Sequence, residues 1–184
     1  QMCIRDRDDS AIRYWLYAAG DGSVNWEKDY SEGIMAIGWG NMGDLTAYAS
    51  KEEMRSKLQE LYGESGSYKN QVLATWQFVN ELKPGDVVFV KKGRKEILGR
   101  GIVEGDYSFN PKRGDFCNIR TVKWMDKGHW ELPDPSVIKT LTDITPYNDL
   151  IKKIQSLIDG DRPETELTQV EEDTESFEPY TCLL

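Results

Sequence analysis

The sequence predicts an α+β fold in which a curved antiparallel sheet, curled into a pseudo-barrel, has flanking helices. The first observation is the order of the patterns, which runs from two strands through two helices to several more strands and a last helix. The second is the short turns between consecutive strands, because short connections favour antiparallel pairing. The third is the change of the hydrophobic period from helical to strand-like after Pro84-Gly85.

The first two predicted strands are short and end at glycines. Residues 12–18 are rich in β-forming side chains, and residues 34–39 form an apolar run with the length of a buried strand. Between these strands, residues 25–32 carry Trp26 and Tyr30 four positions apart, which is typical of a short helical turn. The N-terminal third therefore predicts a strand, a helical turn and a second strand.

Three longer segments have the apolar period of helices. Residues 50–62 begin with Ser50 and Glu53, the spacing of a capping box in which each side chain satisfies a free backbone N–H. Residues 69–82 form a second helical pattern that a Pro-Gly pair ends. Residues 147–158 place their leucines and isoleucines on one face, which predicts a final amphipathic helix.

The segment between the second and third helices alternates with the period of a β-strand. Its basic stretch, residues 91–95, interrupts two apolar runs and predicts a hairpin turn. The expected elements are strands at 86–90, 96–103, 117–124 and 130–132, with an exposed loop at 106–114.

The 184 residues predict one domain and a tail. We expect a disordered or non-native N-terminus at residues 1–10, one recognition domain at 11–158, and an acidic flexible linker at 159–184. Residues 1–7 resemble translated sequencing-adapter text, and residues 182–184 resemble the start of a similar artefact. Both ends are therefore left out of the fold prediction.

The charge is distributed unevenly. The formal net charge is −9, and the stretch 159–178 holds nine acids and one base, so it carries −8 of that total. Residues 1–158 are therefore nearly neutral, and within them residues 85–123 hold nine bases and five acids. Such a basic edge can bind nucleic acid with strong salt dependence. The alternative interpretation is that these basic residues form a solvent-exposed face without a ligand.

Few residues suit catalysis or metal binding. The cysteines Cys3, Cys117 and Cys182 are odd in number and widely spaced, which favours a reducing, cytoplasmic compartment over a disulfide framework. A Ser–His triad would rest on His129 alone, and Asp134 lacks the neighbouring carboxylates of a nuclease. The chain has no phosphate-binding GxxxxGK[ST] motif and no apolar run long enough for a membrane span. We therefore expect no cofactor, no metal, no membrane partner and no enzymatic activity.

Aromatic and basic residues at strand ends instead suggest base recognition. A protein that inspects a base holds it between flat walls and binds the flanking phosphates with cations. Trp39, Tyr107 and Phe109 lie where strands give way to loops, although exposed loop aromatics also serve packing. The cations on neighbouring turns are Lys91, Lys92, Arg94, Lys95, Lys112 and Arg113.

Several stretches, in this order and spacing, resemble an EVE-like domain, which belongs to the same superfamily as PUA and YTH domains. They include Tyr14-Trp15-Leu16-Tyr17, Gly33-Ile34-Met35-Ala36-Ile37-Gly38-Trp39, Lys83-Pro84-Gly85-Asp86-Val87-Val88 and Ile97-Leu98-Gly99-Arg100-Gly101-Ile102-Val103. Over about residues 12–125 the chain is similar to the N-terminal recognition domain of McrB-type modification-dependent restriction proteins, in which an AAA+ motor follows.

The resemblance implies a pocket for a flipped, modified base such as methylcytosine, hydroxymethylcytosine or methyladenine. Trp39 ends the strand that supplies a pocket aromatic in YTH relatives, and Asn41 follows it toward the base edge. Tyr107 lies where a second wall is expected, although YTH relatives carry Trp there. Phe109 and Trp26 complete the expected pocket, with a core position as the alternative for Trp26.

The resemblance also implies partners. We expect modified DNA, or RNA, as the ligand, an AAA+ motor in cis, a nuclease subunit in trans, and oligomerisation through the motor. The alternatives are an RNA-binding or protein-interaction adaptor of PUA-like fold, and a small hydrolase. Converging carboxylates, or His129 beside a nucleophile, would favour the hydrolase.

Overall fold

The structure, a computed structural model, describes residues 11–137 and 139–160. The expected N-terminal segment, the adapter-like ends and the linker beyond residue 160 lie outside the described residues. The strands are β1 (Tyr14–Tyr17), β2 (Ile34–Ile37), β3 (Val87–Lys92), β4 (Glu96–Val103), β5 (Ser108–Phe109), β6 (Asn118–Glu131) and β7 (Leu141–Asp143). The helices are α2 (Trp26–Glu32), α3 (Lys51–Tyr62), α4 (Lys69–Trp76), which continues as a π-helical turn (Gln77–Glu81), and α5 (Asn148–Gly160). Short 3₁₀ turns occupy Asp21–Ser23, Gly40–Met42, Leu45–Ala47 and Pro111–Arg113.

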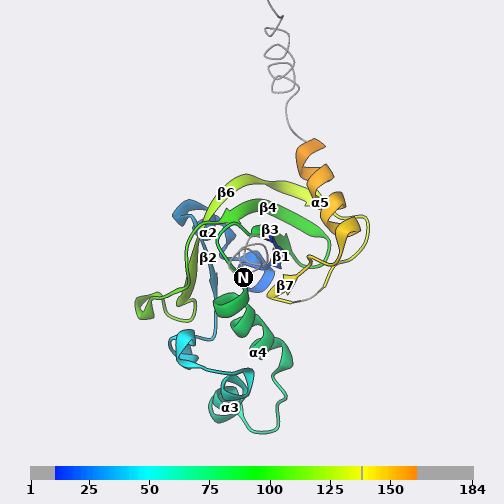
Figure 1. Cartoon of the computed structure of the whole chain (residues 1–184). Helices are drawn as coiled ribbons and strands as arrows, with labels where there is room; N and C mark the ends of the chain where they lie inside the picture. The colour runs from blue at the N-terminus through cyan, green and yellow to red at the C-terminus, as the bar shows by residue number, and fades with distance from the viewer. Residues whose placement is uncertain (1–10, 138, 161–184) are drawn as a thin grey trace, which may run out of the picture.

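The strands form one curled sheet in the order β2-β6-β4-β3-β1-β7, with β5 paired to β6 (Figure 1). This arrangement confirms the predicted α+β class. The sheet is mostly antiparallel, as predicted, and differs at one pair, because β1 runs parallel to β3, with Tyr14 opposite Val87 and Tyr17 opposite Val90. The reason is topological: the helices between β1 and β3 supply the long crossover that a parallel pair needs.

The longest strand, β6, replaces two predicted elements. The sequence predicted separate strands at 117–124 and 130–132, which left His129 in the connection between them. Instead β6 continues without a break from Asn118 to Glu131 and pairs with both β2 and β4. Two register shifts in its ladder with β4 bend it around the sheet, since bulges increase local twist and curvature. His129 therefore lies on a strand rather than in a turn.

The sheet buries a separate apolar cluster on each face. Successive residues of a strand point to opposite faces, so Trp15 and Tyr17 join one cluster while Leu16 joins the other. Helices α3 and α4 cover the first face and α5 covers the second (Figure 1). The helix α5 also extends to Gly160, so the first two residues of the predicted linker belong to the helix.

The helix boundaries follow their capping residues. The Ser50 hydroxyl accepts a hydrogen bond from the Glu53 backbone N–H at 3.2 Å, which confirms the predicted cap of α3. The Glu53 carboxylate in turn accepts from the Ala49 N–H at 2.8 Å, one residue further back than in a standard capping box.

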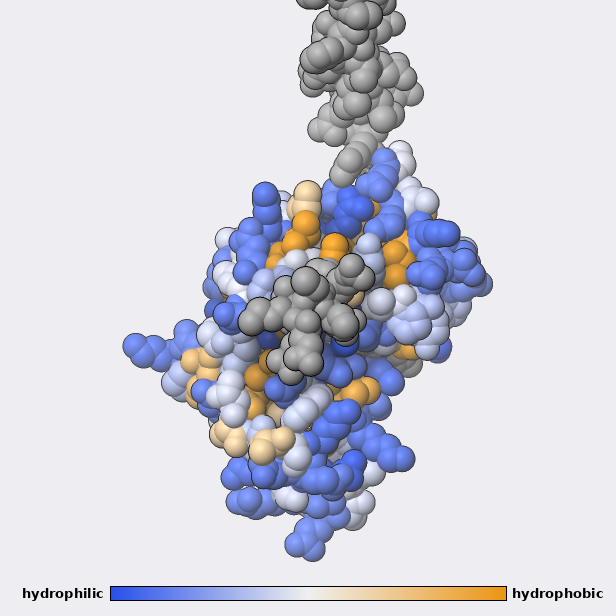
Figure 2. All heavy atoms as spheres, viewed as in Figure 1, coloured by the Kyte–Doolittle hydropathy of each residue, from blue (hydrophilic) through white to orange (hydrophobic). Residues whose placement is uncertain are grey.

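None of the described helices combines the length and the apolar character needed to cross a bilayer. Figure 2 shows hydrophilic residues over most of the visible face, with apolar residues in separate areas.

A buried hydroxyl connects β1, β2 and α2. The Tyr17 hydroxyl lies 2.7 Å from both the Asp29 carboxylate and the Ala36 carbonyl oxygen, and it accepts the Ala36 N–H at 3.0 Å. Asp29 is buried, and burial raises the pKa of its carboxyl from 3.8 to about 6, against the lowering effect of the Tyr17 hydrogen bond. The Tyr17 hydroxyl, which joins the ends of β1 and β2, therefore contacts a carboxyl that titrates in mildly acidic solution.

We predict that this carboxyl makes the fold more stable at low pH. Below pH 3.8 the side chain is protonated in both states; between pH 3.8 and about 6 only the unfolded state ionises, so stability is lost as pH rises. The Asp29→Asn variant lacks this loss. Denaturant unfolding between pH 3.5 and 7 should therefore show wild type losing on the order of 3 kcal/mol relative to the variant. A pH-independent difference would contradict the raised pKa.

Candidate functional site

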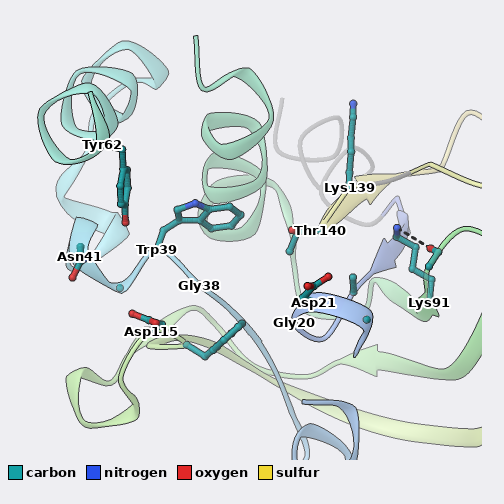
Figure 3. A pocket seen from close by; sticks show the side chains of 15 residues that line it. Gly20, Asp21, Gly38, Trp39, Asn41, Tyr62, Lys91, Asp115, Lys139 and Thr140 are labelled. Atoms are coloured by element: carbon teal, nitrogen blue, oxygen red, sulfur yellow. Dashed lines mark hydrogen bonds between the residues drawn. The ribbon is translucent and has the colours of Figure 1, made fainter. Parts of the chain in front are cut away.

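The main candidate site is a cleft of about 660 Å³ where the ends of several elements meet (Figure 3). Its walls come from the loop after β1, the loop after β2, the end of α3, the β3–β4 hairpin and the loop before β6. The residues that line it with side chains or backbone are Ala18, Gly20, Asp21, Gly22, Gly38, Trp39, Gly40, Asn41, Tyr62, Lys91, Gly93, Asp115, Phe116, Lys139 and Thr140.

Trp39 lies in this cleft with a left-handed backbone, at φ 61° and ψ 38°. For an L-residue with a side chain this conformation costs about 1–2 kcal/mol. The indole is half-buried against the apolar cluster and is one of the side chains that Figure 3 shows lining the cleft. Backbone strain that a fold maintains is concentrated at functional sites, so Trp39 is the leading candidate residue.

The loop that carries Trp39 is fixed by its neighbours. Gly40 approaches the loop before β6 so closely that a Cβ there would lie 2.8 Å from the Gly114 carbonyl oxygen. At the start of β6, the buried Asn118 amide donates to the Gly38 carbonyl at 2.8 Å. Both neighbours of Trp39 are therefore in contact with the segment 114–118, which leaves Trp39 little freedom to relax its backbone.

Tyr107 anchors this loop and is not one of the residues that line the cleft. Its hydroxyl donates to the Asn118 side-chain oxygen at 2.6 Å and accepts the Leu45 N–H at 3.0 Å. Its ring packs edge-on against Phe78, and burial raises the pKa of its hydroxyl to about 12. Tyr107 therefore acts on the cleft through Asn118, a residue that the sequence did not single out.

The structure also moves two other expected pocket aromatics away from the cleft. Trp26 is 4% exposed and packs edge-on against Trp124, with the two ring centroids 4.7 Å apart. It therefore occupies the core position that the sequence offered as the alternative to a pocket role. Its ring occupies space that Gly99 leaves, where a Cβ would lie 2.5 Å from the indole. Phe109 lies in β5, half-buried, opposite Asn118 in the ladder and away from the cleft lining. Trp39 and Asn41 are the expected pocket residues that the structure brings together.

Lys91, expected to contact phosphate, is buried at the cleft wall instead. Its side-chain ammonium donates to the Val137 carbonyl at 2.6 Å and to the Gly93 carbonyl at 3.4 Å. Burial, with the nearby Arg94 charge, lowers its pKa. The residue is 3% exposed because these carbonyls hold it inward, so it is not available to a phosphate on the outer surface.

The remaining hairpin cations are exposed beside the cleft. Lys92, Arg94 and Lys95 surround a shallow hollow that shares Gly22 and Gly93 with the cleft. Arg94 also donates to the Ser136 carbonyl at 3.0 Å, which ties the turn to the following loop. This turn therefore places positive charge next to one end of the cleft.

The other two expected phosphate ligands lie elsewhere. Arg113 forms an ion pair with Glu32 at 2.6 Å and donates to the Phe116 carbonyl. Lys112 is exposed on the same 3₁₀ turn, and neither residue lines the cleft. The six expected cations therefore fall into three groups. Lys92, Arg94 and Lys95 lie on the hairpin turn, Lys91 is buried, and Lys112 and Arg113 lie outside the cleft lining.

His129 and Asp134, the residues considered for catalysis, do not line the cleft. His129 lies 3.1 Å from the Glu96 carboxylate, on the exposed end of β6. Asp134 lies 3.4 Å from the Lys153 ammonium. In residues 11–137 and 139–160, no three His, Cys, Asp or Glu side chains are grouped so as to hold a metal ion.

The sequence did not indicate several residues that line the cleft, among them Tyr62, Asp21, Asp115 and Lys139. Tyr62 lies at the end of the apolar helical pattern 50–62, but it is 51% exposed and faces the cleft (Figure 3). Asp21, Asp115 and Lys139 lie in loops, where no periodic pattern identifies a shared site. Their convergence depends on the tertiary fold.

Comparison with known proteins places the chain in one family. Residues 15–148 match the family described as "Domain of unknown function (DUF8426)", and the chain belongs to it. No curated protein matches the chain. The similar solved structures include the Mmi1 YTH domain, which is 11% identical with a TM-score of 0.44, over 80% of this chain and 75% of that chain.

Two further solved structures have comparable similarity. The YTH domain of the Zygosaccharomyces rouxii MRB1 protein, in complex with N6-methyladenosine RNA, is 10% identical with a TM-score of 0.40, over 78% of this chain and 86% of that chain. Protein Atu2648 from Agrobacterium tumefaciens is 15% identical with a TM-score of 0.35, over 76% and 89% of the two chains. These similarities concern the fold.

The backbone strain at Trp39 gives a stability prediction. Both Trp39→Ala and Trp39→Gly remove the indole, but glycine adopts a left-handed conformation without the Cβ penalty. We expect the glycine variant to be more stable than the alanine variant by about 1 kcal/mol in denaturant unfolding. An alanine variant as stable as the glycine variant, or more so, would show that residue 39 is not strained.

Proposed function

We propose that this domain binds a nucleobase rotated out of a nucleic-acid helix, and that the base is a modified one in DNA: methylcytosine, hydroxymethylcytosine or methyladenine. The observation that carries the proposal is the cleft around Trp39, in which the fold maintains a strained backbone beside an indole. At about 660 Å³ the cleft lies within the usual range of small-molecule sites, roughly 300–1,000 Å³.

The chemistry of the cleft suits this ligand. A base that leaves the helix loses stacking, and an aromatic side chain restores about 1–3 kcal/mol per base. Trp39 and Tyr62 supply aromatic surfaces, and Asn41 supplies an amide that can both donate and accept at a base edge. The polar groups of the cleft would then form hydrogen bonds with the edge of the base, which is how proteins identify a flipped base.

The basic hairpin turn supports a nucleic-acid ligand over a free small molecule. Lys92, Arg94 and Lys95 are exposed next to the cleft, where the phosphates flanking an everted nucleotide would pass. Phosphate contacts position a nucleic acid without reading its sequence. The cleft would therefore supply specificity, and the turn would supply salt-dependent affinity.

The resemblance to McrB-type recognition domains supports the remaining parts of the proposal. The domain would target a modification-dependent restriction complex to modified sites, with an AAA+ motor in cis and a nuclease in trans. The chain would contribute binding, and the motor and nuclease would contribute the chemistry.

Removing the indole tests the site. We expect Trp39→Ala to weaken binding to a duplex with one 5-methylcytosine by about 1–3 kcal/mol, measured by calorimetry, while circular dichroism shows an intact fold. Trp130→Ala, which removes a half-buried tryptophan outside the cleft, should leave affinity unchanged. Equal wild-type binding to plain duplexes and to duplexes that carry methylcytosine, hydroxymethylcytosine or methyladenine would refute modified-base recognition.

Neutralising the hairpin turn tests the phosphate contacts. Lys92→Gln and Lys95→Gln should each weaken binding to modified and plain DNA by the same factor. Each should also reduce the slope of log affinity against log salt by about 1, because one phosphate contact is lost. Lys112→Gln, on the 3₁₀ turn Pro111–Arg113 and outside the cleft lining, is the matched control and should change neither quantity. An unchanged salt slope in the two hairpin variants would place the nucleic-acid backbone elsewhere.

A further inference from the structure

We infer that the cleft selects cytosine and adenine, the bases that carry an amino group on the edge opposite the sugar, and that Asp115 is the residue that makes this selection. This inference rests on the proposed function and adds to it the edge of the base that is read. It assigns a specificity role to a residue that the sequence did not single out.

Asp115 is fixed next to Trp39. Its backbone carbonyl lies 3.2 Å from the position of a Cβ on Gly40 and 4.0 Å from that on Gly38, so residue 115 packs against both neighbours of the tryptophan. Its carboxylate is exposed and lines the cleft. Figure 3 shows it with Asn41 and Tyr62, on the side of Trp39 away from Lys91 and Lys139.

The carboxylate of Asp115 is available to a ligand. Within the described part of the chain its side chain has no hydrogen-bond or ion-pair partner. The two nearest charged groups of its own loop are engaged elsewhere or face solvent, since Arg113 pairs with Glu32 and Lys112 is exposed. An ionised carboxylate only accepts hydrogen bonds, so it requires an N–H or O–H donor from whatever enters the cleft.

The charge of the cleft sets the direction in which a nucleotide enters. The other end carries Lys139 and the buried Lys91 together with one carboxylate, Asp21, and the exposed cations Lys92, Arg94 and Lys95 lie beside it, so positive charge predominates there. A nucleotide with its phosphates at that end points the far side of its base toward Asp115. In cytosine this far side carries the 4-amino group, and in adenine it carries the 6-amino group, which keeps one N–H after a single methylation.

A carboxylate separates these bases from thymine and uracil. Carboxylates accept hydrogen bonds from the cytosine amino group, whereas thymine and uracil present a carbonyl oxygen at the same position. At the 4-position two acceptors then face each other and repel, so a carboxylate aligned with that position loses its hydrogen bond, and only a shift toward the neighbouring N3–H would restore one. Asp115 would therefore admit amino bases and reject the 4-oxo pyrimidines, independently of any methyl group on the ring.

Four pyrimidines separate the amino group from the methyl group: cytosine, 5-methylcytosine, uracil and thymine. Each is placed opposite an abasic site in one duplex sequence, so that none has to break a base pair, and affinity is measured by fluorescence anisotropy. We expect wild type to bind 5-methylcytosine about tenfold more tightly than thymine, because a hydrogen bond to a charged group is replaced by repulsion. In Asp115→Asn this ratio should fall toward one, since an amide can also donate to a carbonyl oxygen.

Asp21→Asn is the matched control, because it removes a second cleft carboxylate on the other side of Trp39 in Figure 3. It should keep the wild-type ratio of 5-methylcytosine to thymine. A wild-type ratio near one, an unchanged ratio in Asp115→Asn, or an equal fall in Asp21→Asn would overturn the assignment.

The same four bases distinguish this inference from the proposed function. If cytosine and 5-methylcytosine bind equally and both exceed thymine, amino-group selection stands and recognition of the methyl group fails. If 5-methylcytosine exceeds cytosine but equals thymine, the methyl group is read and the inference about Asp115 fails.

Discussion

The geometry of the cleft depends on the left-handed backbone of Trp39. A tryptophan adopts this conformation at a cost of about 1–2 kcal/mol, so surrounding contacts must hold it there. Gly40 allows the close approach of the loop before β6, and Asn118, the first residue of β6, donates to the Gly38 carbonyl. Tyr107 in turn holds Asn118. The indole is therefore positioned by the sheet, which prepares the cleft before any ligand arrives.

Groups with different physical roles lie at different positions along the cleft. Its middle carries the indole, one end carries the Asp115 carboxylate, and the other end adjoins the basic β3–β4 turn. Such a distribution repels an anion from one end and attracts it to the other, which orients a nucleotide. The strands β1 and β2, whose ends form two of the walls, are joined beneath the cleft by the Tyr17 hydroxyl.

Much of the fold could be predicted because local signals matched the final structure, as the Ser50 cap and the alternating strands show. The parallel β1–β3 pair and the unbroken β6 could not, since both depend on pairing between distant segments. In the site, Trp39 was predictable from its place at a strand end. Trp26 was not separable from a pocket residue, because its burial depends on the gap at Gly99. Asn118 lies in an ordinary strand pattern, and only the fold shows its contacts.

The central claim is that one everted base lies against the Trp39 indole. The most direct measurement is a crystal structure of the domain with a duplex that contains a single 5-methylcytosine opposite an abasic site. The account predicts the methylated base in the cleft, stacked on the indole, with the flanking phosphates along the β3–β4 turn. A duplex that is bound on another face, or a methylcytosine still stacked within the helix, would contradict it.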